Sequence, residues 1–282
     1  MNAVTPADRY AVIGHPVRHS LSPFIHGMFA KQTEQNMTYH MIEIAPLNLA
    51  ESVKKFFLEG GKGLNVTLPH KQAIVSLCNF RTSRVERARA ANTLALQENG
   101  LVLGDNTDGV GLVADLKKIG FELRNKRILL LGAGGAARGA LGPLLEQAPQ
   151  LIHILNRDAA KAQSLAAEFK DLGELLGDGF DATDGNAYDL IVNATAASLQ
   201  GRMPDIAAST VGRNTLCYDM TYGKDDTPFT RWAKEHNAAA AELGWGMLVE
   251  QAAEAFYLWR GVRPDIAPVL KALKSPTPQR AP

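Results

Sequence analysis

Several features that identify common classes of protein are scarce in this sequence. Only two cysteines occur, Cys78 and Cys217, and both lie among apolar residues. A secreted domain held by disulfides is therefore not expected, and both thiols are predicted to be reduced and buried. The seven histidines do not have the spacing of zinc ligands, which argues against a zinc-dependent alcohol dehydrogenase. No metal is expected.

Excess charge and long apolar runs are also lacking. The formal net charge is +1, so no overall field would attract the chain to nucleic acid or to a membrane. No apolar stretch reaches the roughly 18 residues of a membrane span, and residues 1–25 show no signal-peptide pattern. We therefore expect a cytoplasmic protein that binds neither nucleic acid nor membrane. Its length allows two domains.

A short apolar strand followed by glycines is the most informative stretch that is present. Residues 128–131 predict a buried strand, and Gly132 and Gly134 begin a G-x-G-x-x-A match that opens a predicted helix at 136–147. Gly132 permits a tight turn, and Gly134 lets backbone N–H groups approach a pyrophosphate. A second strand at 151–155 completes a β-α-β unit. Dinucleotide binding is favoured over the alternative, a glycine turn in an ordinary doubly wound sheet.

The residues after the second strand indicate which dinucleotide is bound. NAD enzymes usually place a carboxylate there to accept hydrogen bonds from the ribose 2′-OH, whereas this chain has Asn156 and Arg157, with Lys161 soon after. The two cations suit a 2′-phosphate and favour NADP, although they could also be an ordinary solvated helix start. Asp158 would repel a 2′-phosphate, unless it serves only as the N-cap of the predicted helix 159–169.

Strands and helices alternate in the first hundred residues as well. Strands at 9–14, 37–44 and 63–68 are predicted to alternate with helices at 23–31 and 47–59. This order predicts a mostly parallel α/β sheet before the dinucleotide unit begins.

Two α/β modules with a cleft between them are therefore expected. An Asn-Gly pair at 99–100 indicates a hairpin shortly before the domain change, and the apolar spacing of 247–259 predicts a long helix that returns to the first module. We assign residues 1–106 plus 245–282 to a substrate-binding and catalytic domain. Residues 107–244 are assigned to an NADP-binding, Rossmann-type domain.

Polar side chains gather at the predicted strand ends of the first module, where open α/β sheets bind their ligands. Because buried polar groups need partners, such a set suits a small polyhydroxy acid. The set consists of Ser20, Ser22, Asn65, Thr67, Lys71, Asn92, Thr93, Asn106, Thr107 and Asp108. Structural alternatives exist, because Ser22 and Asp108 could be helix N-caps and Lys71 an ordinary surface lysine. The residues alone leave the roles of Lys71 and Asp108 open.

Taken in order, these motifs resemble those of shikimate dehydrogenases from about Tyr10 to Gly261. The matching segments are S-x-S-P at 20–23, N-V-T-x-P-x-K at 65–71, N-T at 92–93, G-D-N-T-D-G at 104–109, G-A-G-G-A-A at 132–137, N-R at 156–157, Y-D-M-x-Y at 218–222 and G-x-x-M-L-x-x-Q-A at 244–252. Two positions depart from the family pattern: Arg89 replaces a usual glycine, and Asp158 a usual threonine. The serine pair resembles the shikimate-specific branch rather than quinate-using relatives.

The resemblance implies reversible, NADPH-dependent reduction of 3-dehydroshikimate to shikimate, in the pathway to chorismate and the aromatic amino acids. It implies Lys71 and Asp108 as the catalytic residues. The substrate-binding residues it implies are Ser20, Ser22, Asn65, Thr67, Lys71, Asn92, Asp108, Tyr222 and Gln251. The cofactor-binding residues are Gly132, Ala133, Gly134, Gly135, Ala136, Asn156, Arg157, Asp158, Lys161, Thr195, Met220 and Gly244.

Two other functions remain open on the sequence. An NAD-preferring quinate/shikimate dehydrogenase is supported by Asp158 and opposed by Arg157. A non-catalytic nucleotide-binding regulator is opposed by the presence of Lys71 and Asp108. The expected assembly is a monomer or a homodimer, and the expected partner is the small-molecule substrate.

Overall fold

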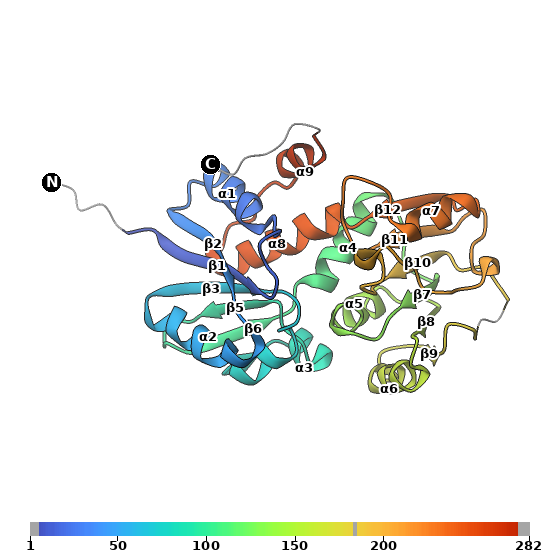
Figure 1. Ribbon diagram of the computed structural model, residues 1–282, viewed down its shortest axis with the longest axis horizontal. Coiled ribbons are helices and arrows are strands. Elements are labelled where there is room, and N and C mark those ends of the chain that lie inside the picture. The colour runs from blue at the N-terminus through green and yellow to red at the C-terminus, as the bar shows by residue number, and fades with distance from the viewer. Residues whose placement is uncertain (1–5, 183–184, 276–282) are drawn as a thin grey trace. The chain divides into compact units, whose positions relative to one another are not determined.

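The computed structural model describes residues 6–182 and 185–275, which form two compact α/β units (Figure 1). One unit extends to Thr107 and resumes at Val249, and the other is Asp108–Leu248. Each unit contains one six-stranded sheet. The predicted fold class, two α/β modules with a Rossmann-type second module, is confirmed.

The first unit has the strand order β2-β1-β3-β5-β6-β4. The neighbours β2-β1, β1-β3 and β6-β4 pair in parallel, and β5 and β6 form an antiparallel hairpin, so the predicted mostly parallel sheet and hairpin are confirmed. The strands are β1 Asp8–Gly14, β2 Met37–Glu43, β3 Gly61–Val66, β4 Phe80–Arg81, β5 Thr93–Leu96 and β6 Val102–Asp105. The helices are α1 Ser22–Gln32, α2 Leu49–Leu58, α3 Ser83–Ala88, α9 Ala267–Lys274 and, from Val249 onward, α8 Trp245–Arg260.

Alternation along β1 explains why helices cover both faces of this sheet. Ala11 and Ile13 pack in one apolar cluster with Val53 of α2. Tyr10 points to the opposite face, where its ring lies 4.8 Å from that of Trp259 in α8. Because successive strand residues point to opposite faces, the buried apolar part of β1, residues 10–13, needs cover on both sides.

The second unit has the strand order β12-β11-β10-β7-β8-β9, and every pairing is parallel. Its strands are β7 Arg127–Leu131, β8 Leu151–Leu155, β9 Leu175–Asp178, β10 Leu190–Asn193, β11 Leu216–Asp219 and β12 Ala240–Leu243. Its helices are α4 Asp108–Lys118, α5 Gly135–Leu145, α6 Ala159–Phe169 and α7 Pro228–Glu235. Along β7, Ile128 packs in the cluster that contains α4, α5 and α6 residues, whereas Leu129 packs in the cluster that contains α7 residues.

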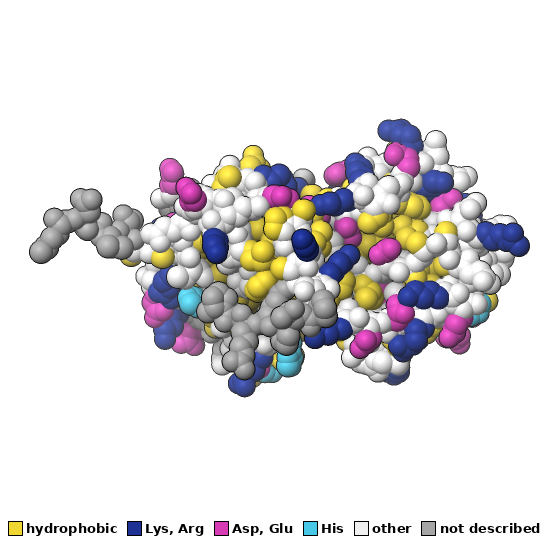
Figure 2. Space-filling model, turned by 90° about the horizontal axis from the view of Figure 1, so that it is seen from above, with side chains coloured by type: hydrophobic (Ala, Val, Ile, Leu, Met, Phe, Trp, Pro, Cys, Tyr) yellow, Lys and Arg dark blue, Asp and Glu magenta, His cyan; other side chains and the backbone are white. Residues whose placement is uncertain are grey.

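The observations on cysteine and surface charge agree with the composition. Cys78 and Cys217 are both buried and make no disulfide, so their predicted burial is confirmed. Figure 2 shows Lys and Arg side chains interspersed with Asp and Glu on the face it presents. Among the described residues, the helices are too short or too polar to cross a bilayer.

The backbone at Arg89 explains why glycine is usual there in the resembling family. Arg89 is the C-cap of α3 and adopts the left-handed conformation, with φ 48° and ψ 35°. This region costs an ordinary L-residue roughly 1 kcal/mol and costs glycine little. Arg89→Gly is therefore expected to raise the free energy of unfolding by about 1 kcal/mol, which denaturant titration would measure.

Arg87 provides the matched control, because it is exposed like Arg89 but lies within α3. Arg87→Gly should lower the stability by roughly 0.5–1 kcal/mol, since glycine is unfavourable inside a helix. Equal effects of the two substitutions would contradict the role given to the left-handed backbone at Arg89.

A buried histidine predicts how stability depends on pH. His26 is 0% exposed, and burial lowers its pKa to about 3, an effect that the nearby Asn65 side chain opposes. Above pH about 6.5 the imidazole is neutral in both the folded and the unfolded chain. As the pH falls from there towards 3, only the unfolded chain takes up the proton, so the free energy of unfolding falls.

His26→Phe should remove this dependence. We expect the loss of stability between pH 6 and pH 4 to become less steep by up to about 1 kcal/mol per pH unit, measured by denaturant titration at each pH. His40→Phe, on the exposed side of β2, is the control and should leave the slope unchanged. Parallel loss of stability in the His26 variant and the wild type would show that His26 does not cause the pH dependence.

Candidate active site

A continuous hydrogen-bond network joins residues of the first unit that the sequence predicts to bind substrate. The strand register places Asn65 of β3 opposite Thr93 of β5, and Asn65 Nδ2 donates to Thr93 Oγ1 at 3.1 Å. Thr93 Oγ1 in turn donates to Asn92 Oδ1 at 2.9 Å. Asn92 Nδ2 donates to Thr107 Oγ1 at 2.9 Å and to Gln251 Oε1 at 3.3 Å. Three predicted substrate residues, far apart in sequence, are thus brought together.

Both the oxygen and the nitrogen of the Asn65 side-chain amide form hydrogen bonds. Its Nδ2 also donates to the backbone oxygen of Asn92 at 3.2 Å, and its Oδ1 accepts a hydrogen bond from the Tyr39 hydroxyl at 2.7 Å. The residue is only 7% exposed. Asn65 is therefore well placed to hold the neighbouring polar groups in a fixed orientation.

The two serines of the S-x-S-P motif also contact each other. Ser20 Oγ accepts a hydrogen bond from the Ser22 backbone N–H at 3.2 Å and donates to Ser22 Oγ at 3.1 Å. The interpretation of Ser22 as an N-cap is wrong, because α1 begins at Ser22 and Leu21 occupies the N-cap position without a side-chain bond. Ser20 satisfies the helix N–H instead, which leaves both hydroxyls at a helix N-terminus, where an anion is favoured.

Lys71 lies in the turn that follows β3. The side chain is half-buried, and its backbone oxygen accepts a hydrogen bond from Ala91 N at 2.8 Å, one residue before Asn92. Upstream in the same loop, Thr67 N donates to Ile13 O at 2.9 Å. These backbone bonds fix the Lys71 turn to both neighbouring strand ends, β1 and β5.

Asp108 is the first residue of α4 and is buried. The residue before it, Thr107, is fixed by its backbone N–H, which donates to Asn92 Oδ1 at 2.8 Å. Chain connectivity therefore ties the Asp108 backbone to the substrate-side network. A carboxylate in the first turn of a helix is also electrostatically favourable.

A partly buried ion pair that the sequence did not reveal supports this loop. Asp105, 1% exposed, accepts bonds from Arg84 Nε at 3.0 Å and Arg84 Nη2 at 2.6 Å, and from Thr82 Oγ1 at 2.7 Å. Arg84 is one of three arginines between residues 84 and 89, and the sequence assigned it no partner. Its two-point contact fixes the start of the segment that ends at Asp108.

On the cofactor side, the glycines lie where the strand order reverses in the second unit. The sheet order places β7 between β10 and β8, so the loop after β7 opens at the switch point of the fold. Gly132 has φ +108°, a conformation that favours glycine. Gly134 is the N-cap of α5, and a Cβ there would meet nothing within 4 Å. Ala133 lies between these glycines, and α5 opens with Gly135 and Ala136, whose N–H groups belong to the first turn of a helix, a kind of position that favours a phosphate.

Neighbouring strand ends complete the same edge of the sheet. Thr195 Oγ1 donates to Asn193 Oδ1 at 2.7 Å, and Met220 N donates to Asn193 O at 3.0 Å. At Gly244 a Cβ would lie 2.6 Å from Met220 O, so a side chain has no room there. Tyr222 is half-buried, and burial raises its pKa, so its hydroxyl remains a donor.

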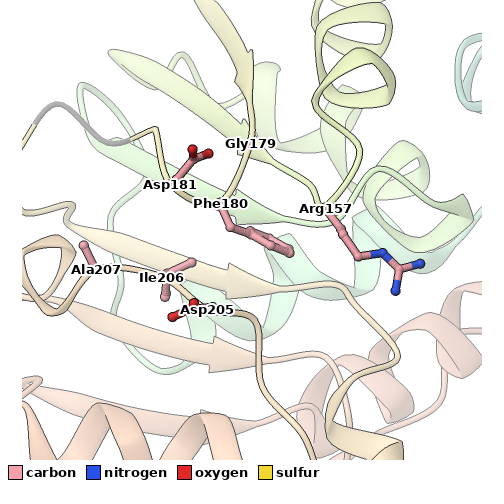
Figure 3. Close-up of a pocket in the computed structure, with 7 residues that line it drawn as sticks. All are labelled: Arg157, Gly179, Phe180, Asp181, Asp205, Ile206 and Ala207. Carbon is pink, nitrogen blue, oxygen red and sulfur yellow. The ribbon is translucent and has the colours of Figure 1, made fainter.

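Arg157, exposed after β8, lines a cavity of about 530 Å³. The other lining residues are Gly179, Phe180, Asp181, Asp205, Ile206 and Ala207. Figure 3 shows the Phe180 ring on the side of the cavity nearest Arg157, with the guanidinium extending away from it. An apolar surface beside a guanidinium suits a planar base attached to a phosphate.

The charge of Asp158 is partly offset by a neighbour. Asp158 Oδ2 lies 3.8 Å from Lys161 Nζ, and both side chains are exposed. Asp158 does occupy the N-cap position of α6, but its side chain makes no capping hydrogen bond. Asn156 Nδ2 donates to Asp158 O at 3.0 Å and so fixes the turn.

Family models match both units of the chain. A model described as the shikimate dehydrogenase substrate binding domain matches residues 12–94, one described as shikimate / quinate 5-dehydrogenase matches 115–206, and a shikimate 5′-dehydrogenase C-terminal domain matches 244–274. The curated shikimate dehydrogenase (NADP(+)) of Aeromonas salmonicida is 53% identical over 95% of this chain and 97% of its own length. The chain belongs to the shikimate dehydrogenase family.

Solved structures agree with this membership. An Ael1 enzyme from Pseudomonas putida is 46% identical, with a TM-score of 0.89 over 96% of this chain and 99% of that one. A shikimate 5-dehydrogenase of Thermus thermophilus, crystallised with NADP(H) and shikimate, is 31% identical, with a TM-score of 0.83 over 94% of this chain and 98% of that one. Within this member of the shikimate dehydrogenase family, the family model for the substrate-binding domain matches the same unit that contains the polar network.

Proposed function

We propose that this chain is an NADP-dependent shikimate dehydrogenase that interconverts 3-dehydroshikimate and shikimate. The observation that carries the proposal is the hydrogen-bonded polar network, which lies in the unit matched by the substrate-binding family model. Amides and hydroxyls at strand ends suit the hydroxyls of a cyclohexene acid, and the Ser20 and Ser22 hydroxyls at the start of α1 suit its carboxylate.

The roles of Lys71 and Asp108 follow from the chemistry of carbonyl reduction. NADPH, when bound, supplies a hydride to the carbonyl carbon. The developing alkoxide then needs one proton, and the Lys71 ammonium is the donor we assign. Asp108 accepts a hydrogen bond from the resulting hydroxyl and orients the Lys71 ammonium. In the oxidation direction the same two groups remove that proton.

We assign NADP to the glycine turn and to the Arg157 side of the second unit. The open space at Gly134 admits a pyrophosphate, and Arg157 is the group for the 2′-phosphate. The curated relatives named for NADP(+) include one that is 49% identical. An NAD-preferring enzyme and a non-catalytic regulator are both disfavoured by these relatives.

Arg157→Ala should weaken NADP selectively. Loss of a charge-assisted contact with the 2′-phosphate is expected to raise KM for NADP by about 10- to 100-fold and to leave KM for NAD and for shikimate almost unchanged. Lys170→Ala is the control, because Lys170 is an exposed cation at the C-cap of α6, the helix that follows Arg157. Steady-state kinetics with both cofactors decides the matter, and an equal rise in KM for NADP and NAD would contradict the assignment.

The assembly and location are part of the proposal as well. We place the enzyme in the cytoplasm, because NADPH is an intracellular reductant and both thiols are buried and unpaired. We expect a monomer or a homodimer, which sedimentation measurements would distinguish.

Product analysis in the reduction direction tests the function. Purified protein with 3-dehydroshikimate and NADPH should yield shikimate in equal amount to the NADPH consumed, identified by chromatography and mass spectrometry. Consumption of NADPH without shikimate, or no consumption at micromolar enzyme, would overturn the proposal.

A further inference from the structure

Tyr39 lies between the two halves of the substrate-side site, although no sequence motif pointed to it. It belongs to β2, next to β1 in the sheet. Its hydroxyl donates to Asn65 Oδ1 at 2.7 Å. Burial raises the pKa of this hydroxyl well above its ordinary value, and a side-chain hydrogen bond with Ser22 opposes that rise. The Tyr39 hydroxyl thus contacts Asn65 and lies beside Ser22, one member of the serine pair.

The Tyr39 ring is held in place by the ring of His26. The two rings are stacked, with centroids 4.3 Å apart and planes within 6°. The His26 ring also packs against Phe29, Phe256 and Trp259, with centroids between 5.3 and 6.2 Å away. Among the described residues, neither ring nitrogen of His26 has a hydrogen-bond partner of normal geometry. A fully buried imidazole in this position supports the Tyr39 ring by stacking and does not compete for its hydroxyl.

Tyr39 thus connects groups with different tasks. Ser22 stands with Ser20 at the start of α1, the place assigned to the substrate carboxylate. Asn65 begins the network that continues through Thr93 and Asn92, the place assigned to the ring hydroxyls. A stiff aromatic residue with two rotatable bonds can hold such groups in one relation at little entropic cost.

We propose that Tyr39 is a substrate-positioning residue, which holds Ser22 and Asn65 at the spacing that a cyclic acid needs between its carboxylate and its ring hydroxyls. The proposal rests on the proposed function and deepens it. It makes Tyr39 a determinant of selectivity for the free acid, because the Tyr39 hydroxyl orients the serine that would bind the carboxylate.

Tyr39→Phe tests the proposal, because it keeps the ring and its stacking and removes only the hydroxyl. We expect KM for shikimate and its dissociation constant, measured by calorimetry, to rise about tenfold, with a smaller change in kcat and an unchanged KM for NADP. Thermal melting verifies that the variant is folded. Tyr257→Phe, an exposed tyrosine of α8, is the matched control and should behave as the wild type.

Two readouts separate positioning from a merely structural role. The preference for shikimate over its methyl ester, as a ratio of kcat/KM, should fall in Tyr39→Phe, because only the acid uses the oriented serine. In a Ser22→Ala background, Tyr39→Phe should have a smaller effect on shikimate binding than it has alone. An unchanged acid-to-ester ratio, or full additivity of the two substitutions, would overturn the proposal. Shikimate binding is measured directly by calorimetry. A wild type that binds shikimate without turnover would therefore count against the proposed function, while the difference in shikimate binding between Tyr39→Phe and the wild type would still test the role of Tyr39.

Discussion

Lys71→Ala is expected to lower kcat by a factor of about 10² to 10⁴, with much less effect on binding of shikimate and NADP. The alanine cannot give a proton to the alkoxide or take one from the hydroxyl, so the chemical step loses its acid and base. The backbone bond between Lys71 O and Ala91 N does not involve the side chain, so the turn should keep its structure. Steady-state rates and calorimetric binding of shikimate measure the two effects separately.

Lys62→Ala is the control for this substitution, because Lys62 is exposed on β3 and lies before the same loop. It should keep the wild-type kcat. If Lys71→Ala also kept the wild-type kcat, Lys71 would be an ordinary surface lysine, the alternative that the sequence leaves open. A loss of binding as large as the loss of kcat would instead make Lys71 a binding residue.

The second large effect is expected from Asp108→Asn. The amide has nearly the shape of the carboxylate but carries no negative charge, so it cannot perform the orienting role that we propose for Asp108. We expect kcat to fall by about 10²-fold or more and the melting temperature to change much less, because the amide keeps the shape of the side chain and only the modest attraction of the carboxylate to the helix N-terminus is lost. Initial rates and thermal melting on the same preparation are the measurements.

Asp225→Asn, in an exposed loop of the same unit, is the control for Asp108 and should leave both quantities unchanged. If Asp108→Asn altered only the melting temperature, the carboxylate would be a structural group at the start of α4. A lower kcat with normal melting is the outcome that assigns it to the chemistry.

Local sequence signals were strongest in the interior of each sheet. The glycine turn at Gly132 and the apolar strands around it predict β7, α5 and β8 from residues that are adjacent in the chain. The edge strands β9 and β12 were not predicted, and neither was α7. Leu175–Asp178 contains a glycine and an aspartate, and Ala240–Leu243 consists of residues that favour helices, so only pairing with a neighbouring strand makes these segments extended.

The site residues depend even more on tertiary structure. Asn92 and Gln251 are hydrogen-bonded across 159 positions of sequence, and only the family resemblance suggested that they act together. The sequence suggested Ser22 as an N-cap, but Ser20 Oγ accepts a hydrogen bond from the Ser22 backbone N–H. Both residues are serines near the start of the helix, so the local sequence could not tell which one takes this role. The Arg84–Asp105 pair was not predicted, since nothing near Arg84 in sequence indicates the buried Asp105.

Tyr39 shows why such residues are missed. In sequence it is one aromatic residue in a strand of mixed polarity, and such residues usually serve packing. Its hydroxyl becomes informative only when the register of β1, β2 and β3 brings it to Asn65. A tyrosine, rather than phenylalanine, at a half-buried strand position was the one available signal.

The most direct test of the account is a single set of initial rates on the purified wild type, with shikimate and quinate each combined with NADP and NAD. We expect fast turnover with shikimate and NADP, and rates lower by at least about tenfold in the other three combinations, since each lacks at least one charge-assisted or hydrogen-bonded contact. Faster turnover with NAD or with quinate would contradict the assignment of Arg157 or of the serine pair, and no turnover in any combination would contradict the enzymatic function itself.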